Sequence, residues 1–341
     1  MPFFVGPGSS PDGGLEMKSD RVGFPTATSD PGSAVLADMY LQTVGAGATL
    51  RLYDGNEWRN FDTARLTATG GTKSTFNGKT IHTFTSDGTF TVTAGGGTVE
   101  YVIVGGGGAG GAQGGGGGAG GYRTGSTPVN TNLTVTVGDG ATADSDRNNT
   151  PANGESSSVN FPAGTITSAG GGGGGARFDT AGTGGSGGGA NGNHSPANGS
   201  AGNTPPVSPP QGNTGGNGAG SPTEASGGGG GAGAVGGNAS SNVGGAGGVG
   251  VQVPATFRNP AATFDPDAQW YLAGGGGGSV STSPTGTGGV GGDGGGGNAN
   301  VTYNGNGSPG TTNTGGGGGA APYQRTGGNG GSGLVLIAYP T

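Results

Sequence analysis

Short runs in which β-branched or aromatic residues alternate with polar ones follow one another from residue 63 onward. Turn signals such as Asp87-Gly88 and Gly95–Gly97 separate them. The pattern predicts seven strands: Thr80–Thr85, Thr89–Thr93, Val99–Val104, Leu133–Val137, Ser157–Phe161, Thr165–Thr167 and Leu334–Thr341. No stretch has an apolar period of 3.6 residues, so almost no α-helix is expected. We interpret the seven strands as one antiparallel β-sandwich, closed by the C-terminal strand and formed by 63–104, 122–168 and 334–341.

Residues 1–62 have a different pattern, with relatively little glycine and more large side chains. Alternation predicts strands at Asp38–Leu41 and Thr49–Tyr53, and Asp54-Gly55 is a hairpin turn before Glu57-Trp58-Arg59. This arrangement resembles a small hairpin module near the N-termini of phage fibre and virion-appendage proteins. The resemblance implies an attachment or docking module, in which we expect Tyr40, Tyr53 and Trp58 to make the contacts. A generic β-hairpin is the alternative.

Composition changes the picture for the rest of the chain. Of 341 residues, 94 are Gly and 21 are Pro, whereas hydrophobic residues make up 28% and charged residues 9%. So little apolar side chain argues against a large conventional core. So little charge argues against ordinary disorder, which couples weak hydrophobicity to high net charge. A flexible glycine-rich linker array is the alternative to an ordered structure.

The glycine falls in blocks, of which the longest is Gly105–Gly121. Collagen is excluded because runs such as Gly170–Gly175 break the G-X-Y period. A calcium-binding β-roll is disfavoured because the match at Gly288–Asp293 has no tandem copy. The remaining conformation is the extended left-handed helix with three residues per turn, here called a rod. Glycine rods can approach closely on every side and hydrogen-bond laterally, which predicts a dense polyglycine-II lattice over 105–333.

The order of the blocks predicts how the rods connect. Five pairs of rods, about ten rods in all, are expected between the strand Val99–Val104 and the last strand. The first member of each pair runs outward from the sandwich: Gly105–Gly111, Gly170–Gly175, Gly227–Gly231, Gly274–Gly278 and Gly315–Gly319. The second member returns: Gly114–Gly121, Gly184–Gly189, Gly244–Gly250, Gly288–Gly297 and Gly327–Gly333. The connections that face the sandwich are expected to be long with apolar anchors: 122–168, 190–226, 251–273 and 298–314. The connections at the other, distal end are expected to be short.

Few residues suggest chemistry. The chain has no cysteine, and a formal net charge of −7 argues against nucleic-acid binding. His82 is expected to be structural and His194 to lie in a solvated loop, so we expect no catalytic group and no cofactor. Asp139, Asp144 and Asp146 offer oxygens to Ca²⁺, but a solvated acidic loop is the favoured interpretation, and no metal site is expected. The N-terminus has no secretory signal pattern, which predicts synthesis in the host cytoplasm.

The combined motifs resemble a known family. VIVGGGGAGG at the end of a strand, a paired GGGGGAGGYR, VTVGDG, SSSV and a closing GGSGLVLIAYPT are similar to the phage glycine-rich domain and to the fibre-tip adhesins of T-even-type phages. The resemblance covers about residues 75–341 and implies a virion protein, on a tail fibre or another particle appendage. It implies a non-catalytic adhesin that binds a host-surface saccharide or outer-membrane protein and assembles with a fibre shaft, tail or capsid protein.

Two other functions remain open, a structural head-fibre or capsid decoration protein and a polysaccharide depolymerase. A homotrimer is expected only by analogy with other phage appendages.

The distal loops are the candidate receptor-binding surface. The residues are Gln113, Arg177, Phe178, Asp179, Asn238, Tyr323, Gln324 and Arg325. Aromatic rings beside hydrogen-bonding groups in short turns suit the recognition of a saccharide or a protein surface. The alternative for Phe178 and Tyr323 is that they only cap the end of the lattice against water.

Overall fold

The computed structural model describes the strands between residues 16 and 60, and residues 65–341 apart from 194–196, 221–223, 262–268, 281–285 and 301–304. The chain divides into two compact units. One comprises Met1–Thr67 with Ala94–Gly96, and the other comprises Ala68–Thr93 with Gly97–Thr341.

The N-terminal unit contains two small sheets. Strands β1 (Glu16–Lys18) and β2 (Arg21–Gly23) pair with each other. The second sheet has the order β3-β4-β5-β6, with bounds Thr26–Ala27, Met39–Val44, Gly47–Tyr53 and Trp58–Asn60. The two predicted strands are therefore confirmed as β4 and β5, and β4-β5 and β5-β6 are antiparallel. Asp54-Gly55 lies outside the described residues, as do the side chains of Tyr40, Tyr53 and Trp58, whose backbones belong to β4, β5 and β6.

The second unit contains a sandwich of two five-stranded sheets, with orders β15-β14-β13-β10-β7 and β12-β11-β18-β9-β8. All seven predicted strands are present: β9 (Lys79–Phe84), β10 (Gly88–Ala94), β11 (Gly97–Val104), β13 (Leu133–Thr136), β14 (Ser157–Phe161), β15 (Gly164–Ser168) and β18 (Leu334–Pro340). Three strands were not predicted: β7 (Thr67–Thr69), β8 (Thr72–Phe76) and β12 (Tyr122–Val129). All three lie at sheet edges, where few side chains need to be apolar, and an edge strand tolerates Pro128.

The central strand β18 is buried on both faces, which explains its continuous apolar sequence. One face packs into the sandwich, where Tyr339 meets Phe90 edge-to-face with ring centroids 6.0 Å apart. The other face carries Leu334 and Leu336, which cluster with Phe257 and other residues of the connection 251–273. This connection contains β16 (Val251–Gln252), the 3₁₀ turn η1 (Ala255–Phe257) and β17 (Tyr271–Leu272). Of the phenylalanines in this connection, Phe257 is buried, whereas Phe264 lies outside the described residues.

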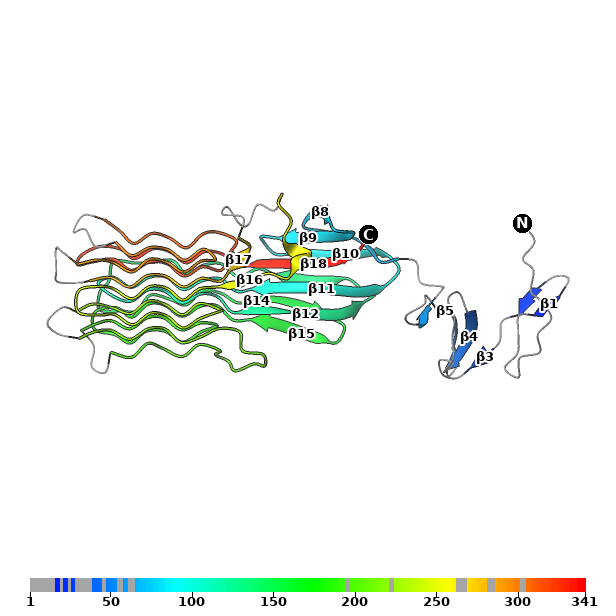
Figure 1. Ribbon diagram of the computed structural model, residues 1–341, viewed down its shortest axis with the longest axis horizontal. Helices are drawn as coiled ribbons and strands as arrows, with labels where there is room; N and C mark the ends of the chain where they lie inside the picture. The colour runs from blue at the N-terminus through cyan, green and yellow to red at the C-terminus, as the bar shows by residue number, and fades with distance from the viewer. Residues whose placement is uncertain are drawn as a thin grey trace. The chain divides into compact units, whose positions relative to one another are not determined.

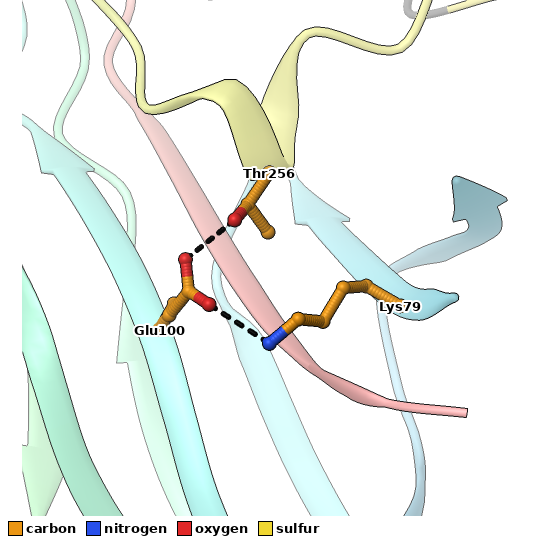
Figure 2. Close-up of polar contacts among 3 residues, drawn as sticks. All are labelled: Lys79, Glu100 and Thr256. Atoms are coloured by element: carbon orange, nitrogen blue, oxygen red, sulfur yellow. Dashed lines mark hydrogen bonds and ion pairs between the residues drawn. The ribbon is translucent and has the colours of Figure 1, made fainter. Parts of the chain in front are cut away.

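Polar contacts fix η1 to the sheet (Figure 2). Glu100 on β11 accepts a 2.6 Å hydrogen bond from the Thr256 hydroxyl and a 2.9 Å bond from the Lys79 ammonium group. Burial raises the pKa of Glu100, but the bonds from Thr256 and Lys79 lower it, and the net pKa lies below the ordinary value. The connection 251–273 is thus part of the folded core rather than a free loop.

From the sandwich the chain runs out into a bundle of extended glycine-rich segments, drawn as wavy traces in Figure 1. Hydrogen bonds between these segments repeat every third residue. Gly105, Gly108 and Gly111 donate in turn to the carbonyl groups of Gly121, Gly118 and Gly115. A period of three is that of the polyglycine-II helix, and no glycine of Gly105–Gly121 has a positive φ. The segments are therefore the rods expected from the sequence.

The rod 114–121 shows why the bundle becomes a lattice. Each residue has one N–H donor and one carbonyl acceptor. Because the rod has three residues per turn, its N–H groups point in three directions and its carbonyl groups point in three others. Successive N–H groups of the rod donate to three neighbours, at distances between 2.8 and 3.1 Å, and its carbonyl groups accept from three others. The donors face the rods 169–175, 225–231 and 315–321, and the acceptors face 105–111, 185–190 and 273–278. Six neighbours together pair the N–H groups of 115–121 and all the carbonyl groups of the rod except that of Gly120, as burial requires.

Glycine is required here because of the close approach of these backbones. A Cβ atom at Gly115 would lie 2.0 Å from the Gly189 carbonyl oxygen, and one at Gly117 would lie 2.2 Å from the Gly108 oxygen. Both distances are far below contact distance, and the obstacle is backbone that cannot rotate away. Alanine is tolerated at Ala119, which is fully buried against the apolar cluster at the sandwich end of the lattice.

The described residues contain more rods than the ten expected. Nine run outward: 105–111, 138–141, 169–175, 185–190, 211–218, 234–237, 273–278, 295–300 and 315–321. Nine return: 114–121, 151–155, 180–183, 197–203, 225–231, 244–250, 287–292, 305–311 and 326–333.

Three expected directions were also wrong. Gly288–Gly297 was expected to return, but its last residues belong to the outward rod 295–300, since Gly274 and Gly277 of the outward rod 273–278 donate to Gly294 and Gly297 in the same order. Gly172 and Gly175 donate to Ser186 and Gly189, so 185–190 runs outward beside 169–175 instead of returning. The rod 225–231 returns, because Gly116 and Ala119 donate to Gly227 and Gly230 in the same order.

The missed rods are poor in glycine because many lie at the edge of the lattice. An edge rod has neighbours on only part of its circumference, so its other positions accommodate Asn, Ser, Ala or Pro with the side chain in solvent. The segment 197–203 is an example, with several partly or fully exposed residues. The connections 122–168, 190–226 and 298–314 therefore contain further rods and distal loops, and are not simple loops on the sandwich.

Candidate functional site at the distal end of the lattice

The distal end is the face where the outward rods reverse, away from the sandwich. The first reversal, at Ala112-Gln113, is buried, with Ala112 3% and Gln113 1% exposed. It contacts the reversal after 315–321 through the backbone bridge between Ala112 and Ala321. It also contacts the reversal after 185–190, where the Asn191 side-chain amide donates to the Gln113 carbonyl. Loops far apart in sequence therefore form one continuous surface.

Gln113 has a structural position within that surface. Its φ is +53°, which allows the chain to reverse tightly between two rods. Only 1% of the residue is exposed, and its side-chain Oε1 is buried without a hydrogen-bond partner. Gln113 thus lies at the floor of the distal surface rather than at its tip.

The loop 176–180 is held by Asp179. Its two carboxylate oxygens accept from backbone N–H groups, from Thr180 at 2.8 Å and from Thr150 at 3.2 Å. The Thr150 hydroxyl in turn donates to the Thr180 carbonyl at 2.7 Å. Asp179 therefore joins two distal loops, and its carboxylate is committed to their backbone.

Two arginine–aromatic pairs lie on these loops. The Arg177 guanidinium stacks on its neighbour Phe178, 5.1 Å from the ring centroid, and the Arg147 guanidinium stacks on Tyr323 at 4.9 Å. The Phe178 N–H donates to the Arg147 carbonyl at 3.3 Å, so the loops that carry the two pairs are adjacent. Phe178 is 59% exposed, whereas Tyr323 is only partly exposed.

Arg177 also faces an acidic side chain from another loop. Its Nη2 lies 4.0 Å from Glu224 Oε1, and the two side chains are 26% and 17% exposed. Arg177 Nε and Glu224 Oε2 are buried without hydrogen-bond partners, and so is Asn193 Nδ2. This group of polar atoms is less completely paired than the lattice beneath it.

The other sequence-predicted residues lie apart from this group. Asn238 is exposed, and its Oδ1 accepts a 2.8 Å bond from the Asn217 N–H. Gln324 is exposed with φ +56°, and Arg325 is partly exposed; both follow Tyr323 in the reversal before 326–333.

Sequence reasoning missed Arg147, Asn193 and Glu224, because it assigned their segments to connections on the sandwich. The signal that could have found them is glycine on both sides of a polar loop, such as Gly138 and Gly140 before Arg147 and Gly154 after it.

The acidic loop before Arg147 forms turns. Asp144 Oδ1 accepts from the Asp146 N–H at 2.9 Å, and Asp146 Oδ1 accepts from the Asn148 N–H at 2.8 Å. In the described residues, no three His, Cys, Asp or Glu side chains gather as metal ligands would. His194 lies outside the described residues. Across the same part of the chain, no helix combines the length and apolar character that crossing a membrane demands.

The family match covers both the sandwich and the lattice. The glycine-rich domain family matches residues 83–340. The chain belongs to the glycine-rich domain family. The matched range begins within β9 and ends with β18, so in this glycine-rich domain the rods and the strands that anchor them form one unit. No curated protein matches the sequence.

The flank of the glycine-rich domain differs from its distal end. Apart from Phe178, the exposed large hydrophobic residues in the described part of the chain are Val235, Val243, Val249 and Val290. Val235, Val249 and Val290 lie on neighbouring rods, since Ala234 donates to the Val249 carbonyl and Gly247 donates to the Val290 carbonyl. These three residues are called the flank valines, and their side chains serve as a comparison because they carry no aromatic ring and no charge.

Proposed function

We propose that this protein is a bacteriophage virion adhesin, located on a tail fibre or another particle appendage. In this function the glycine lattice is a non-catalytic scaffold, and its distal loops bind the host cell surface. The N-terminal unit joins the protein to another virion protein of a fibre shaft, tail or capsid, through Tyr40, Tyr53 and Trp58. The proposal needs no cofactor and no nucleic acid, and it takes a homotrimer only by analogy.

The observation that carries the proposal is the gathering of aromatic and charged side chains at the distal end. Phe178 is 59% exposed there, and two arginines stack on aromatic rings of adjacent loops. Exposed aromatic residues beside arginine are typical of binding surfaces. The Phe178 ring is more exposed than a ring that only seals the lattice against water needs to be, which favours a binding role over capping.

The scaffold suits this function physically. A rod of seven residues extends about 22 Å, and the backbone N–H groups of 115–121 in the central rod all donate to neighbouring rods. Such a lattice holds its loops at a fixed distance from the sandwich, at small entropic cost when a receptor binds. Loops on rigid elements also tolerate changes of sequence without loss of the fold.

The test is binding of the purified protein to cells of the host bacterium, followed by competition with virion adsorption. We expect the wild-type protein to bind and to reduce adsorption. The triple variant Arg177→Ala, Phe178→Ala, Tyr323→Ala should lose both effects, and Val235→Ser with Val290→Ser should retain both. Undiminished binding by the triple variant would contradict the assignment of these loops.

A structural head-fibre or decoration protein is the second candidate, and the density of hydrogen bonds in the lattice favours it. In that function the rods are a stiff spacer and need no receptor. Antibody labelling of intact virions separates the two candidates, because labelling of the capsid face supports the spacer and labelling of fibre tips supports the adhesin. Release of sugar from host polysaccharide by the purified protein would instead indicate a depolymerase.

A further inference from the structure

Rods at the flank of the lattice keep backbone groups that no neighbour pairs. Most N–H groups of the rod 244–250 donate to the rods 287–292 and 225–231. Those of Ala246 and Val249 have no hydrogen-bond partner in the described part of the chain. Unpaired backbone groups along an exposed edge are a template on which another chain can pair, as on an edge strand of a sheet. The flank therefore needs a feature that keeps further rods away.

One open position of the lattice lies beside both 244–250 and 287–292. Around the central rod 114–121, neighbours that accept hydrogen bonds from the rod alternate with neighbours that donate to it. Because 287–292 accepts from 244–250, a donating neighbour belongs on each side of it. The rod 273–278 fills one side by donating to the carbonyl groups of 244–250, and no described residue fills the other. We call this second side the open position.

The open position has the hydrogen-bonding groups that a further rod would need. By the three-residue period, the carbonyl groups of Gly244 and Gly247 point to it from one rod. The N–H groups of Val290 and Asp293 point to it from the other. None of these four groups has a partner among the described residues. A glycine rod in the open position would pair all four, as rods of the interior pair one another.

Two side chains obstruct the open position. Cβ atoms three residues apart on a rod share a direction. On 244–250, a Cβ at Gly247 or Gly248 would lie 1.9 Å or 2.2 Å from a carbonyl oxygen of a neighbouring rod. Those two directions belong to filled positions, so the third direction, that of the exposed residues Ala246 and Val249, belongs to the open position. A rod there would meet their Cβ atoms at a similarly short distance, far inside contact distance.

Five other edge rods repeat this arrangement. On each, the residues whose Cβ atoms point away from the neighbouring rods recur at a spacing of three and are exposed or partly exposed. These residues are Asn198 and Ala201; Thr214 and Asn217; Val235 and Asn238; Thr287, Val290 and Asp293; and Thr326, Asn329 and Ser332. None of them is glycine, although 94 of the 341 residues in the chain are. We call these residues, together with Ala246 and Val249, the rim.

Asparagine closes an edge in a second way, by pairing an N–H group that has no rod to accept it. Asn217 Oδ1 accepts from the Gly199 N–H at 2.9 Å, and Asn298 Oδ1 accepts from the Gly291 N–H at 2.7 Å. The side-chain amide thus takes the place of a rod carbonyl. Among the described residues no such amide caps Val290, so at the open position the volume of side chains alone keeps a rod away.

The valines favour blocking over a purely conformational reason for avoiding glycine. Glycine loses more backbone entropy on folding than other residues do, but alanine or serine would remove that cost as well. The flank valines, Val235, Val249 and Val290, instead leave apolar side chains in water, with 61%, 38% and 63% of each residue exposed. A β-branched side chain is stiff, so it holds the space beside its rod.

We propose that the rim keeps the lattice from taking up a rod of a second copy of this chain, and that the open position is an interface closed by Ala246 and Val249. Removal of these two Cβ atoms opens the interface, and a second copy then pairs the four free backbone groups. The inference concerns the flank of the lattice and does not depend on the proposed function.

The test compares two variants of the full-length protein by sedimentation velocity over a series of concentrations. Ala246→Gly with Val249→Gly removes both Cβ atoms. The matched control, Ala246→Ser with Val249→Ser, removes the valine side chain but keeps a Cβ at each position. We expect the glycine variant to form, at high concentration, a species of about twice the wild-type mass or more that dissociates on dilution. The serine variant should sediment as the wild type does.

Two results would overturn the proposal. One is a glycine variant that melts cooperatively and sediments like the wild type at every concentration. The other is equal association of the serine variant, which would show that the Cβ atoms do not close the flank. Glycine also adds entropy to the unfolded chain. If the double variant does not melt cooperatively, Val249→Gly is compared with Val249→Ser, with the same outcomes expected.

Hydrogen exchange locates the association on the protein. In the glycine variant, the N–H groups of Val290 and Asp293 should exchange about tenfold more slowly at high concentration than after dilution. Association without slower exchange at these two N–H groups would mean that the copies meet through another surface, and would contradict the assignment of the open position.

Discussion

Replacing one glycine in a central rod tests the lattice most sharply, and Gly117→Ala is the most informative change. Its Cβ would lie 2.2 Å from the Gly108 carbonyl oxygen, which is 1.2 Å short of the 3.4 Å at which ordinary contact begins. The obstacle is backbone, so the two rods must separate. The 2.9 Å hydrogen bonds from Gly108 to Gly118 and from Gly111 to Gly115 would then stretch to about 4 Å and be lost.

The expected cost follows from these two effects. Overpacking in a closely packed interior costs about 1–3 kcal/mol, and two lost hydrogen bonds add about 1 kcal/mol each. Gly117→Ala should therefore lower the free energy of unfolding by about 3–5 kcal/mol, and the melting temperature by on the order of 10 °C. Thermal unfolding followed by circular dichroism, with denaturant titration as a second measurement, gives both quantities.

A matched control separates packing from backbone conformation. Gly78 has φ +72°, and a Cβ atom on it would meet nothing within 4 Å, so Gly78→Ala adds conformational strain without a clash. That strain costs about 1–2 kcal/mol. If Gly117→Ala destabilises the protein no more than Gly78→Ala does, the close approach of the rods is not what requires glycine.

Three further predictions concern single side chains. Burial of His82 lowers its pKa below the ordinary 6.5, so the unfolded chain binds the proton more tightly than the folded chain does. The free energy of unfolding should therefore fall as the pH drops from about 6.5 to the folded-state pKa, by up to about 1.4 kcal/mol per pH unit. A free energy of unfolding that stays constant between pH 7 and 4 would contradict this. For Glu100 the folded-state pKa is also lowered, so the stabilisation by its carboxylate is present above pH 4.5 and is lost as the pH falls through the folded-state pKa. Glu100→Gln should lower the free energy of unfolding, measured with urea at pH 7, by no more than about 1 kcal/mol because the side chain is 33% exposed. A larger loss would mean that η1 depends on the charge. Asp179→Ala should free the Thr150 and Thr180 amides and raise their hydrogen-exchange rates about tenfold while the melting temperature changes little; unchanged exchange would show that Asp179 does not join these loops.

Local patterns predicted much of the sandwich, because alternation and turn residues are local signals. The seven predicted strands are all present, and the apolar run Leu334–Tyr339 identified the strand that is buried on both faces. Strand β12 was missed because Gly125 and Pro128 interrupt its pattern. Gly125 makes a close tertiary contact, since a Cβ on it would lie 2.6 Å from the Tyr101 hydroxyl and would displace that ring. That contact does not appear in the local sequence.

Glycine blocks predicted the central rods but not the edge of the lattice. A rod at the centre needs glycine at most positions, whereas edge rods such as 197–203 carry Ser, Ala and Asn. The partners of a rod are also far apart in sequence, as with Gly117 and Gly318, and nothing in a local pattern specifies them. The pairing of Arg177 with Glu224 depends on that lateral order, so it could not be predicted.

The central claim is that the lattice presents its distal loops to the host while its flanks take no part. Hydrogen–deuterium exchange of the full-length protein, with and without saturating host cell-envelope fragments, tests this claim directly. We predict slower exchange on binding in 142–150, 176–180, 191–193 and 322–325, with no change at the flank valines or in the N-terminal strands. Protection at the flank valines, with the distal loops unchanged, would contradict the account.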